Sequence, residues 1–199
     1  RGTLSRIYAE YTDKVQFYAQ YYNNPNDPDS NRVDRSRFQY YDQKFLVSRG
    51  GQWYFKEKRL NIYAGVDFAF SLSKKSDYTA IVVVGVDDSN DVYVLDIDRF
   101  KSDKISEYYD RLVAMQSKWD FKKLRAEVTV AQAVIVNDLK QRFKENGINI
   151  KIDEFRPTRH QGSKEERIAA VLEPRYAQLG MWHYRGGYIP VLEEEILLA

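Results

Sequence analysis

Cysteine is absent from the 199-residue sequence, and long apolar runs are absent with it. Without cysteine the chain has no disulfide framework, no thiolate zinc site and no cysteine nucleophile. No stretch approaches the roughly 18 apolar residues that a membrane-spanning helix needs, and residues 1–6 lack the apolar run of a signal peptide. We therefore expect a cytosolic protein. No Gly-x-x-x-x-Gly-Lys-Ser/Thr loop occurs, so the sequence encodes no ATP hydrolysis of that type.

Charge is nearly balanced over the whole chain, with 31 Lys+Arg against 29 Asp+Glu. Residues 1–60 hold 11 basic and 7 acidic residues, whereas residues 61–199 hold 20 and 22. A near-neutral total is compatible with a basic face for nucleic acid and with an acidic pocket for metal ions. Hydrophobic residues make up 43% of the chain, which suits one globular domain with an appendage. Because the first residue is Arg1 rather than Met, we expect a piece of a longer protein.

Residues 1–60 are predicted to form an N-terminal helix and a linker arm, and residues 61–199 the core. Apolar residues recur at helical spacing over residues 3–24. The following residues, up to 37, are polar and rich in turn formers, which is typical of a loop. Residues 38–59 mix aromatic and charged side chains, and we expect an irregular connection there.

The core alternates between strand and helix patterns. The predicted strands are residues 62–69, 79–86, 91–99, 124–130, 148–155 and 181–184. The predicted helices are residues 105–115, 131–145 and 163–179, followed by a final helix that begins near Pro190. Asp103 is a possible cap of the first of these helices. Three strands joined by tight turns form an antiparallel meander, and helix-linked strands follow, so the sequence predicts an α/β fold with a mixed sheet flanked by helices.

Two carboxylates interrupt apolar strand segments: Asp67 lies inside the first core strand and Glu127 inside the fourth. A buried acid is costly unless a partner compensates it. If the fourth strand packs in parallel beside the first, the two side chains emerge about 5 Å apart. With no Cys and only two His, oxygen ligands then favour Mg²⁺ or Mn²⁺ over zinc. The alternative is that each acid pairs with an Arg or Lys, or caps a strand end.

Several segments occur in an order that is similar to a known family. They are Phe17–Pro25, Gly65–Ala69, Lys75–Ala80, Glu127 in a later strand, and Ser163–Ile168. Together they resemble the nuclease domain of tailed-bacteriophage large terminases, the packaging motors that cut viral DNA. The resemblance covers residues 17–199 and implies a ribonuclease H-like fold, which agrees with the predicted order of strands and helices.

The resemblance implies roles for three acids. Asp67 and Glu127 match the first and second metal-binding acids of the family, and Asp77 matches an acid that supports the site. Asp67 and Glu127 would hold two Mg²⁺ or Mn²⁺ ions for phosphodiester hydrolysis, with Asp67 bridging the ions. For Asp77 the alternative is a turn residue between two strands.

The family's third acid lies in an Asp-rich motif beyond the final strand, and no match precedes Ala199. Glu193, Glu194 and Glu195 are poor substitutes, because a charge run on an amphipathic helix is usually a solvated face. A third acidic ligand is therefore not evident in this sequence, which indicates either a truncated chain or a missing tail.

The implied substrate is double-stranded DNA, cut with little sequence preference because basic side chains contact phosphates rather than bases. Candidate contacts, each of which can also be an ordinary surface charge, are Lys74, Lys75, Arg156, Arg159 and Lys164. His160 and His183 are treated as structural. The family also implies a portal, a small terminase subunit and an ATPase domain as partners, with packaging in the host cytoplasm at the procapsid. We expect the isolated domain to be a monomer.

Three other functions compete with this interpretation. A junction resolvase or transposase-like nuclease would share the paired acids but lack the segment from Gln20 to Pro25. A sugar-kinase or actin-like ATPase would need Gly and Thr where residues 73–76 have Ser-Lys-Lys-Ser, and two lobes do not fit in 199 residues. A non-catalytic module that docks on DNA or the portal predicts no useful affinity for divalent metal.

Overall fold

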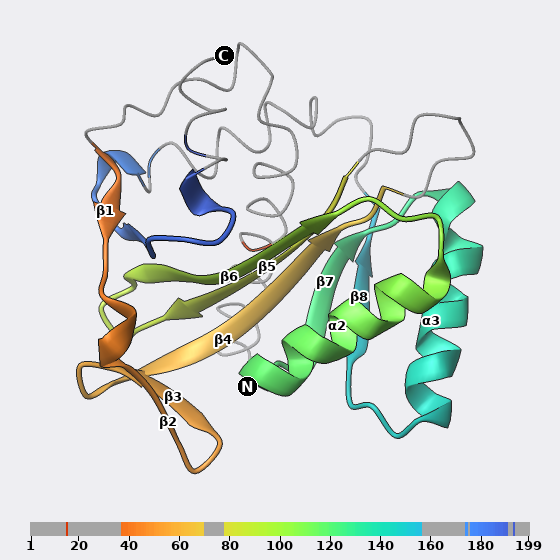
Figure 1. Cartoon of the computed structure of the whole chain (residues 1–199), viewed down its shortest axis with the longest axis horizontal. Helices are drawn as coiled ribbons and strands as arrows, with labels where there is room; N and C mark the ends of the chain where they lie inside the picture. Colours follow the sequence, from red (N-terminus) through yellow and green to blue (C-terminus); the bar gives the residue numbers. More distant parts are fainter. Residues whose placement is uncertain are drawn as a thin grey trace.

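The computed structural model describes residues 37–69, 78–156 and 176–190, together with Val15, Pro174 and Glu193 (Figure 1). Several predictions fall outside these residues: the helix at residues 3–24, the candidate site residues Lys74, Lys75, Asp77, Arg159 and Lys164, His160, and most of the predicted helix at 163–179. Among the described helices, none is long and apolar enough to span a membrane.

A single mixed sheet organises the described part of the chain. Its strands are β1 (Gln39–Tyr40), β2 (Leu46–Arg49), β3 (Gln52–Phe55), β4 (Lys58–Asp67), β5 (Thr79–Val86), β6 (Val92–Phe100), β7 (Lys123–Glu127), β8 (Lys151–Phe155) and β9 (Met181–His183). Helix α2 spans Ile105–Trp119 and helix α3 spans Ala133–Glu145, and the short 3₁₀ helices η3 and η4 span Gln43–Phe45 and Val130–Gln132.

The strand order confirms the predicted topology. The main path is β1-β9-β6-β5-β4-β3-β2, and β7 pairs with β4 and with β8. β4, β5 and β6 form the antiparallel meander, whereas β7 lies parallel to both β4 and β8. All eight residues of β5 are buried, because this strand lies between β4 and β6 and is covered on both faces, which explains its unbroken apolar sequence.

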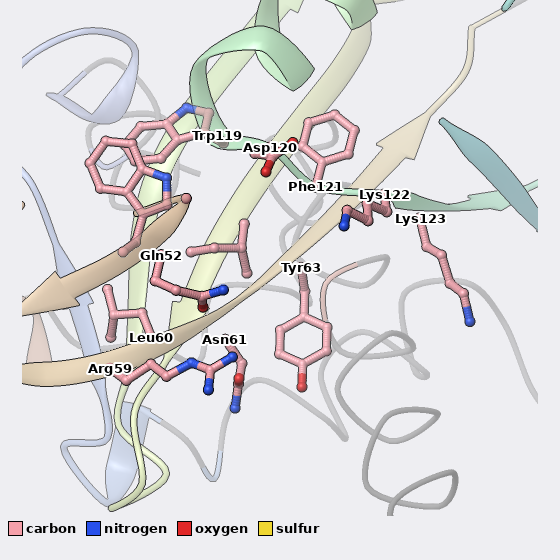
Figure 2. Close-up of a pocket in the computed structure, with 13 residues that line it drawn as sticks. Gln52, Arg59, Leu60, Asn61, Tyr63, Trp119, Asp120, Phe121, Lys122 and Lys123 are labelled. Carbon is pink, nitrogen blue, oxygen red and sulfur yellow. The ribbon is translucent and has the colours of Figure 1, made fainter. Parts of the chain in front are cut away.

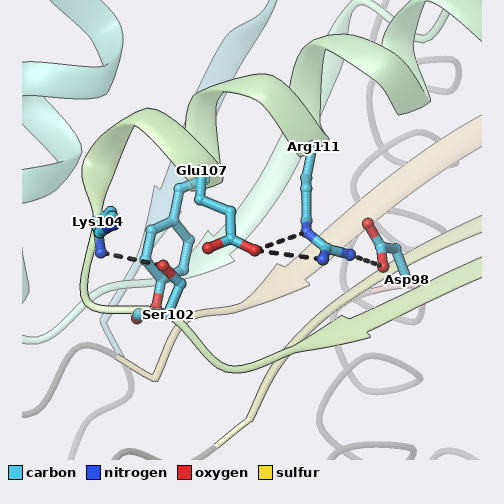
Figure 3. A network of polar contacts seen from close by, with 6 residues as sticks. Asp98, Ser102, Lys104, Glu107 and Arg111 are labelled. Atoms are coloured by element: carbon cyan, nitrogen blue, oxygen red, sulfur yellow. Dashed lines mark hydrogen bonds and ion pairs between the residues drawn. The ribbon is translucent and has the colours of Figure 1, made fainter.

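In Figure 1, helix α2 crosses in front of the sheet, and helix α3 lies next to α2 at the side of β8. The buried residues of α2 recur every three or four positions, and they are Tyr108, Leu112, Met115 and Trp119. Polar contacts join α2 to β6: Arg111 Nη1 lies 2.7 Å from Asp98 Oδ1, and Trp119 Nε1 donates to Asp96 Oδ2 over 2.9 Å. Figure 3 shows the first of these contacts, with Glu107 on the other side of Arg111.

The predicted cap of α2 is wrong. The N-cap is Lys104, and it makes no side-chain capping bond. Ser102 organises the start of the helix instead, because its Oγ accepts a bond from the Lys104 amide over 3.1 Å and its carbonyl oxygen accepts one from the Tyr108 hydroxyl over 2.7 Å (Figure 3). Asp103 is therefore not the N-cap of α2.

The expected irregular connection over residues 38–59 is also wrong, because this stretch adds strands β1, β2 and β3 to the sheet. Gly50 and Gly51 form the two-residue turn between β2 and β3, and both have positive φ, +58° and +76°. Such a turn matches the twist of a hairpin, and glycine adopts it without steric cost. The division of the chain at residue 60 stays a prediction, and β4 runs through it.

Candidate active site

The two acids found in the sequence lie at the carboxyl ends of neighbouring strands. β4 and β7 pair in parallel through Ala64–Leu124, Gly65–Arg125 and Val66–Ala126. Asp67 and Glu127 each follow the last of these pairs by one residue and end their strands. Since adjacent strands lie about 4.8 Å apart and paired residues share a face, the two carboxylates project side by side. The predicted parallel packing of these strands is confirmed, whereas the catalytic roles of the two acids stay predictions.

The acids face away from α2. Thr79 Oγ1 lies 3.3 Å from the Tyr108 hydroxyl of α2, so Thr79 points toward that helix. The next residue, Ala80, therefore points to the opposite face, and it pairs with Asp67. Asp67 is only 9% exposed and Glu127 is half-buried. A largely buried carboxylate needs compensation by hydrogen bonds, a proton or a cation.

Hydrogen bonds hold the chain just beyond both acids. Gln132, in the 3₁₀ helix that follows β7, donates from Nε2 to the carbonyl oxygen of Phe68 over 3.2 Å. A capping box between Thr129 and Gln132 fixes the same turn. On the β4 side, the amide of Ala69 donates to Thr79 Oγ1 over 3.0 Å. The segment after Glu127 is thus tied directly to the segment after Asp67.

Arg99 lies in the same row of the sheet as the acids. Ala80 pairs with Asp67 on one side and with Arg99 on the other, so Asp67, Ala80 and Arg99 share one face. Ala80 is small, so no large side chain stands between the arginine and the acid in this row. The guanidinium carbon of Arg99 lies 3.8 Å from the centre of the Tyr78 ring, and Lys101 Nζ lies 4.5 Å from it. This concentrates positive charge near the acids, as phosphate binding requires.

A second arginine follows the same face along β7. Arg125 precedes Glu127 by two residues, so both side chains point to one side of the sheet. Its Nη1 lies 3.2 Å from Asp153 Oδ2, and its guanidinium carbon lies 5.0 Å from the centre of the Phe155 ring. These contacts hold Arg125 against β8.

Sequence reasoning missed Arg99, Gln132 and Arg125. The alternation of the strand at residues 91–99 could have put Arg99 on a face, but its alignment with Asp67 depends on a register shift between Val83 and Val84. Of the predicted DNA contacts, only Arg156 is described: it is exposed and follows Phe155, the residue that pairs with Glu127. Arg156 therefore lies at the same end of the sheet as the acids.

Glu193 is buried, so the expected solvated face is wrong for this residue. His183 Nδ1 lies 2.9 Å from Glu193 Oε1, the Tyr176 hydroxyl lies 2.7 Å from His183 Nε2, and the Tyr40 hydroxyl donates to Glu193. The pairing of Tyr40 with His183 across β1 and β9 brings these groups together. β9 pairs with the Val92–Tyr93 end of β6, far from Arg99, so Glu193 does not join the acid pair.

The donor set at the strand ends suits a hard divalent cation. Two adjacent carboxylates, one largely buried, supply the oxygen ligands that Mg²⁺ and Mn²⁺ prefer. Within the described residues, no group of three or more His, Cys, Asp or Glu side chains is placed to hold a metal ion. The pair therefore fits part of a metal site, and Asp77 lies outside the described residues.

Comparison with solved structures gives distant likenesses. The large terminase nuclease from thermophilic phage G20c is 17% identical, with a TM-score of 0.49, over 80% of this chain and 76% of that one. The same nuclease with bound zinc is 16% identical, with a TM-score of 0.47, over 80% and 82%. Thermus thermophilus RuvC in complex with a Holliday junction substrate is 11% identical, with a TM-score of 0.39, over 60% and 97%. Comparison with curated proteins found no match.

A family model gives the more direct result. The model of the bacteriophage T7 terminase ribonuclease H-like domain matches residues 71–179, more than half of the chain. The matched region contains β5 to β8 and Glu127, and its mixed sheet agrees with the α/β fold expected from the sequence. The chain therefore belongs to the bacteriophage T7 terminase ribonuclease H-like family.

Proposed function

We propose that this chain is the nuclease domain of a viral DNA-packaging terminase large subunit and that it cuts double-stranded DNA by phosphodiester hydrolysis. One observation carries the proposal: the parallel pairing of β4 and β7 puts Asp67 beside Glu127 at one sheet end, in a chain of the terminase ribonuclease H-like family. A third carboxylate, Asp77, is proposed to support the pair.

Asp67 and Glu127 are the residues that would hold Mg²⁺ or Mn²⁺. When bound, two such ions lower the pKa of an attacking water and stabilise the leaving oxygen of the phosphodiester. The task of the protein is to keep the carboxylates fixed, because catalysis of this kind depends on preorganised charge. The bond from Gln132 to Phe68 and the bond from Ala69 to Thr79 do this from two sides.

Positive side chains near the acids would bind the DNA backbone. Arg99 lies on the acid-bearing face, and Arg156 follows the strand beside Glu127. Because phosphates carry no sequence information, contacts of this kind predict cutting with little sequence preference. Lys74, Lys75, Arg159 and Lys164 remain proposed contacts of the same kind. The portal, the small terminase subunit, an ATPase domain and a place in the host cytoplasm are proposed from the family alone.

Cleavage of supercoiled plasmid tests the proposal. The wild-type chain is incubated with Mn²⁺, Mg²⁺ or EDTA beside Asp67→Asn, Glu127→Gln and the control Glu145→Gln, which changes an exposed acid at the end of α3. We expect nicking that requires metal, is lost in the first two variants and persists in the control. Nicking that survives both site substitutions would show that these acids are not the catalytic pair.

Calorimetric titration with Mn²⁺ gives a readout that does not need turnover. We expect heat of binding for the wild type and for Glu145→Gln, and little for Asp67→Asn. A folded wild type that neither binds Mn²⁺ nor cuts plasmid, even with a longer C-terminus, supports the non-catalytic docking module.

A further inference from the structure

A pocket of about 330 Å³ lies at the opposite end of β4 from Asp67 (Figure 2). It forms where β4 changes neighbours: β3 pairs with β4 as far as Leu60, and β7 begins to pair with it at Ala64. In the described ladders, residues 61–63 pair only with β5, so one edge of β4 opens into the pocket. Its volume falls within the range of roughly 300–1,000 Å³ that small-molecule sites occupy.

Aromatic side chains form one wall of the pocket. The rings of Trp53, from β3, and Trp119, the last residue of α2, have centroids 4.7 Å apart. Trp119 is 3% exposed, and its bond to Asp96 fixes its indole. Trp53 is half-buried, so part of its ring is accessible to a ligand. A rigid tryptophan pair of this kind offers a surface on which a flat ring stacks.

Positive charge surrounds the aromatic wall. Arg59 approaches from β4, and Lys122 and Lys123 approach from the start of β7, so that cations lie on two sides of the pocket (Figure 2). Asp120 is the one acid in its lining. Arg59 and Lys122 are both exposed, and neither takes part in an ion pair within the part of the chain that the structure describes. Asn61 follows Leu60, the residue that pairs with Trp53, so its side chain projects to the same face of β4 as Arg59 and to the face opposite Trp53.

An aromatic face with cations nearby matches the chemistry of one nucleotide, which has a flat base and an anionic phosphate. We infer that this pocket binds an unpaired nucleotide of a DNA strand, with the base against Trp53 and the phosphates beside Arg59 and Lys122. The inference deepens the proposed function, on which the choice of DNA as the ligand rests. Asn61 and Asp67 are six residues apart on one strand, or about 20 Å, so a single DNA strand can reach both.

Fluorescence anisotropy tests the inference without cleavage. A labelled 12-nucleotide oligo-dT is titrated in EDTA against the Asp67→Asn chain, at several salt concentrations. The pocket variant adds Arg59→Glu and Lys122→Glu, and the control variant adds Lys44→Glu and Lys144→Glu, an identical change of charge at exposed lysines outside the pocket. We expect the pocket variant to bind oligo-dT at least tenfold more weakly. The slope of log affinity against log salt concentration should become shallower by about 1.4, the value for two lost phosphate contacts on a single strand. The control should change affinity less than twofold.

A second variant separates stacking from charge. Trp53→Leu should weaken oligo-dT binding about fivefold or more while leaving the salt dependence unchanged. If that variant does not fold, as judged by circular dichroism, the exposed charge-reversal pair alone decides. The inference is overturned if the pocket variant binds oligo-dT as tightly as the control variant does. It is also overturned if a 12-bp duplex binds as tightly as oligo-dT and its affinity falls by the same factor in the pocket variant. The Asp67→Asn chain should lose plasmid nicking but should bind oligo-dT as tightly as the wild-type chain. Failure of the proposed cleavage and failure of the pocket inference therefore give different results.

Discussion

The side-chain amide of Gln132 donates a hydrogen bond to the carbonyl oxygen of Phe68 over 3.2 Å, and this bond joins the two chain segments that follow the paired acids. Gln132 is buried, with 9% of its surface exposed. The spacing of Asp67 and Glu127 is therefore maintained by the sheet up to the strand ends and by Gln132 just beyond them.

Replacing Gln132 with Met should lower plasmid nicking while the fold is kept. Met has nearly the same shape but leaves the Phe68 carbonyl without this donor and the Thr129 amide without its acceptor, so the free energy of unfolding should fall by about 1–3 kcal/mol. We expect kcat to fall about tenfold with KM unchanged, because Gln132 positions the acids rather than touching DNA. Urea denaturation and nicking kinetics measure the two effects. Gln141→Met on the exposed side of α3 is the control. If kcat fell equally in Gln141→Met, the positioning role of Gln132 would be contradicted.

Replacing Arg99 with Gln should weaken the interaction with DNA more than the chemical step. The guanidinium shares a sheet row with Asp67, and one lost phosphate contact costs several-fold in affinity. We expect kcat/KM for nicking to fall about fivefold to tenfold, mostly through KM, and to fall less at high salt. Arg142→Gln on α3 gives the matched control. An Arg99→Gln chain with wild-type KM contradicts the contact.

Arg111 should control the pKa values of two carboxyls on either side of it (Figure 3). Burial raises the pKa of Asp98 above its usual range, and Arg111 opposes this rise. A hydrogen bond from Ser102, assisted by Arg111, lowers the pKa of Glu107. Arg111→Met should therefore raise the pKa of both carboxyls, and NMR titration of the side-chain carboxyl carbons measures each one. Lys140→Met, which removes the partner of Glu154, should move neither.

The raised pKa of Asp98 also determines whether the free energy of unfolding rises or falls with pH. A carboxyl whose pKa is higher in the folded state gives stability that is complete below its unfolded value, about 3.9, and is lost as the pH rises through the folded value. We expect Asp98→Asn to remove this part of the decline in unfolding free energy above pH 4. Urea titrations at pH 3, 5 and 7 on both proteins check it, and parallel curves would contradict the assignment.

Replacing Glu57 with Gly should stabilise the protein. Lys56 and Glu57 form the two-residue turn between β3 and β4 with φ of 47° and 71°, a conformation that costs non-glycine residues about 1–2 kcal/mol. After the entropic cost of glycine, Glu57→Gly should raise the free energy of unfolding by about 0.5–1 kcal/mol in urea. Asp88→Gly, at an exposed turn position without positive φ, should destabilise instead.

The sequence predicts the parts of this fold that depend on local patterns. Asp67 and Glu127 stand out because each is a charge inside an apolar strand, and the meander follows from short turns between β-branched runs. The hairpin at residues 46–55 was missed because its charged and aromatic residues hide the alternation, although Gly50 and Gly51 carried the turn signal.

Arg99, Gln132 and the pocket depend on tertiary arrangement. The alignment of Arg99 needs the register of three strands, Gln132 acts across two loops, and the pocket exists only because β3 and β7 leave a gap along β4. Burial of Glu193 likewise depends on partners from β1 and β9, which no helical pattern reveals.

β4 is one uninterrupted strand of ten residues that carries the pocket near its start and Asp67 at its end. A strand cannot be shortened or stretched without changing its residue count, so β4 fixes the distance between the pocket and Asp67. Side chains alternate between faces, and one inserted residue would therefore turn the acid toward α2, whereas two would keep its face and move it by about 6.6 Å. The distance between the pocket and Asp67 can thus change only in steps of two residues if Asp67 is to keep its face of the sheet.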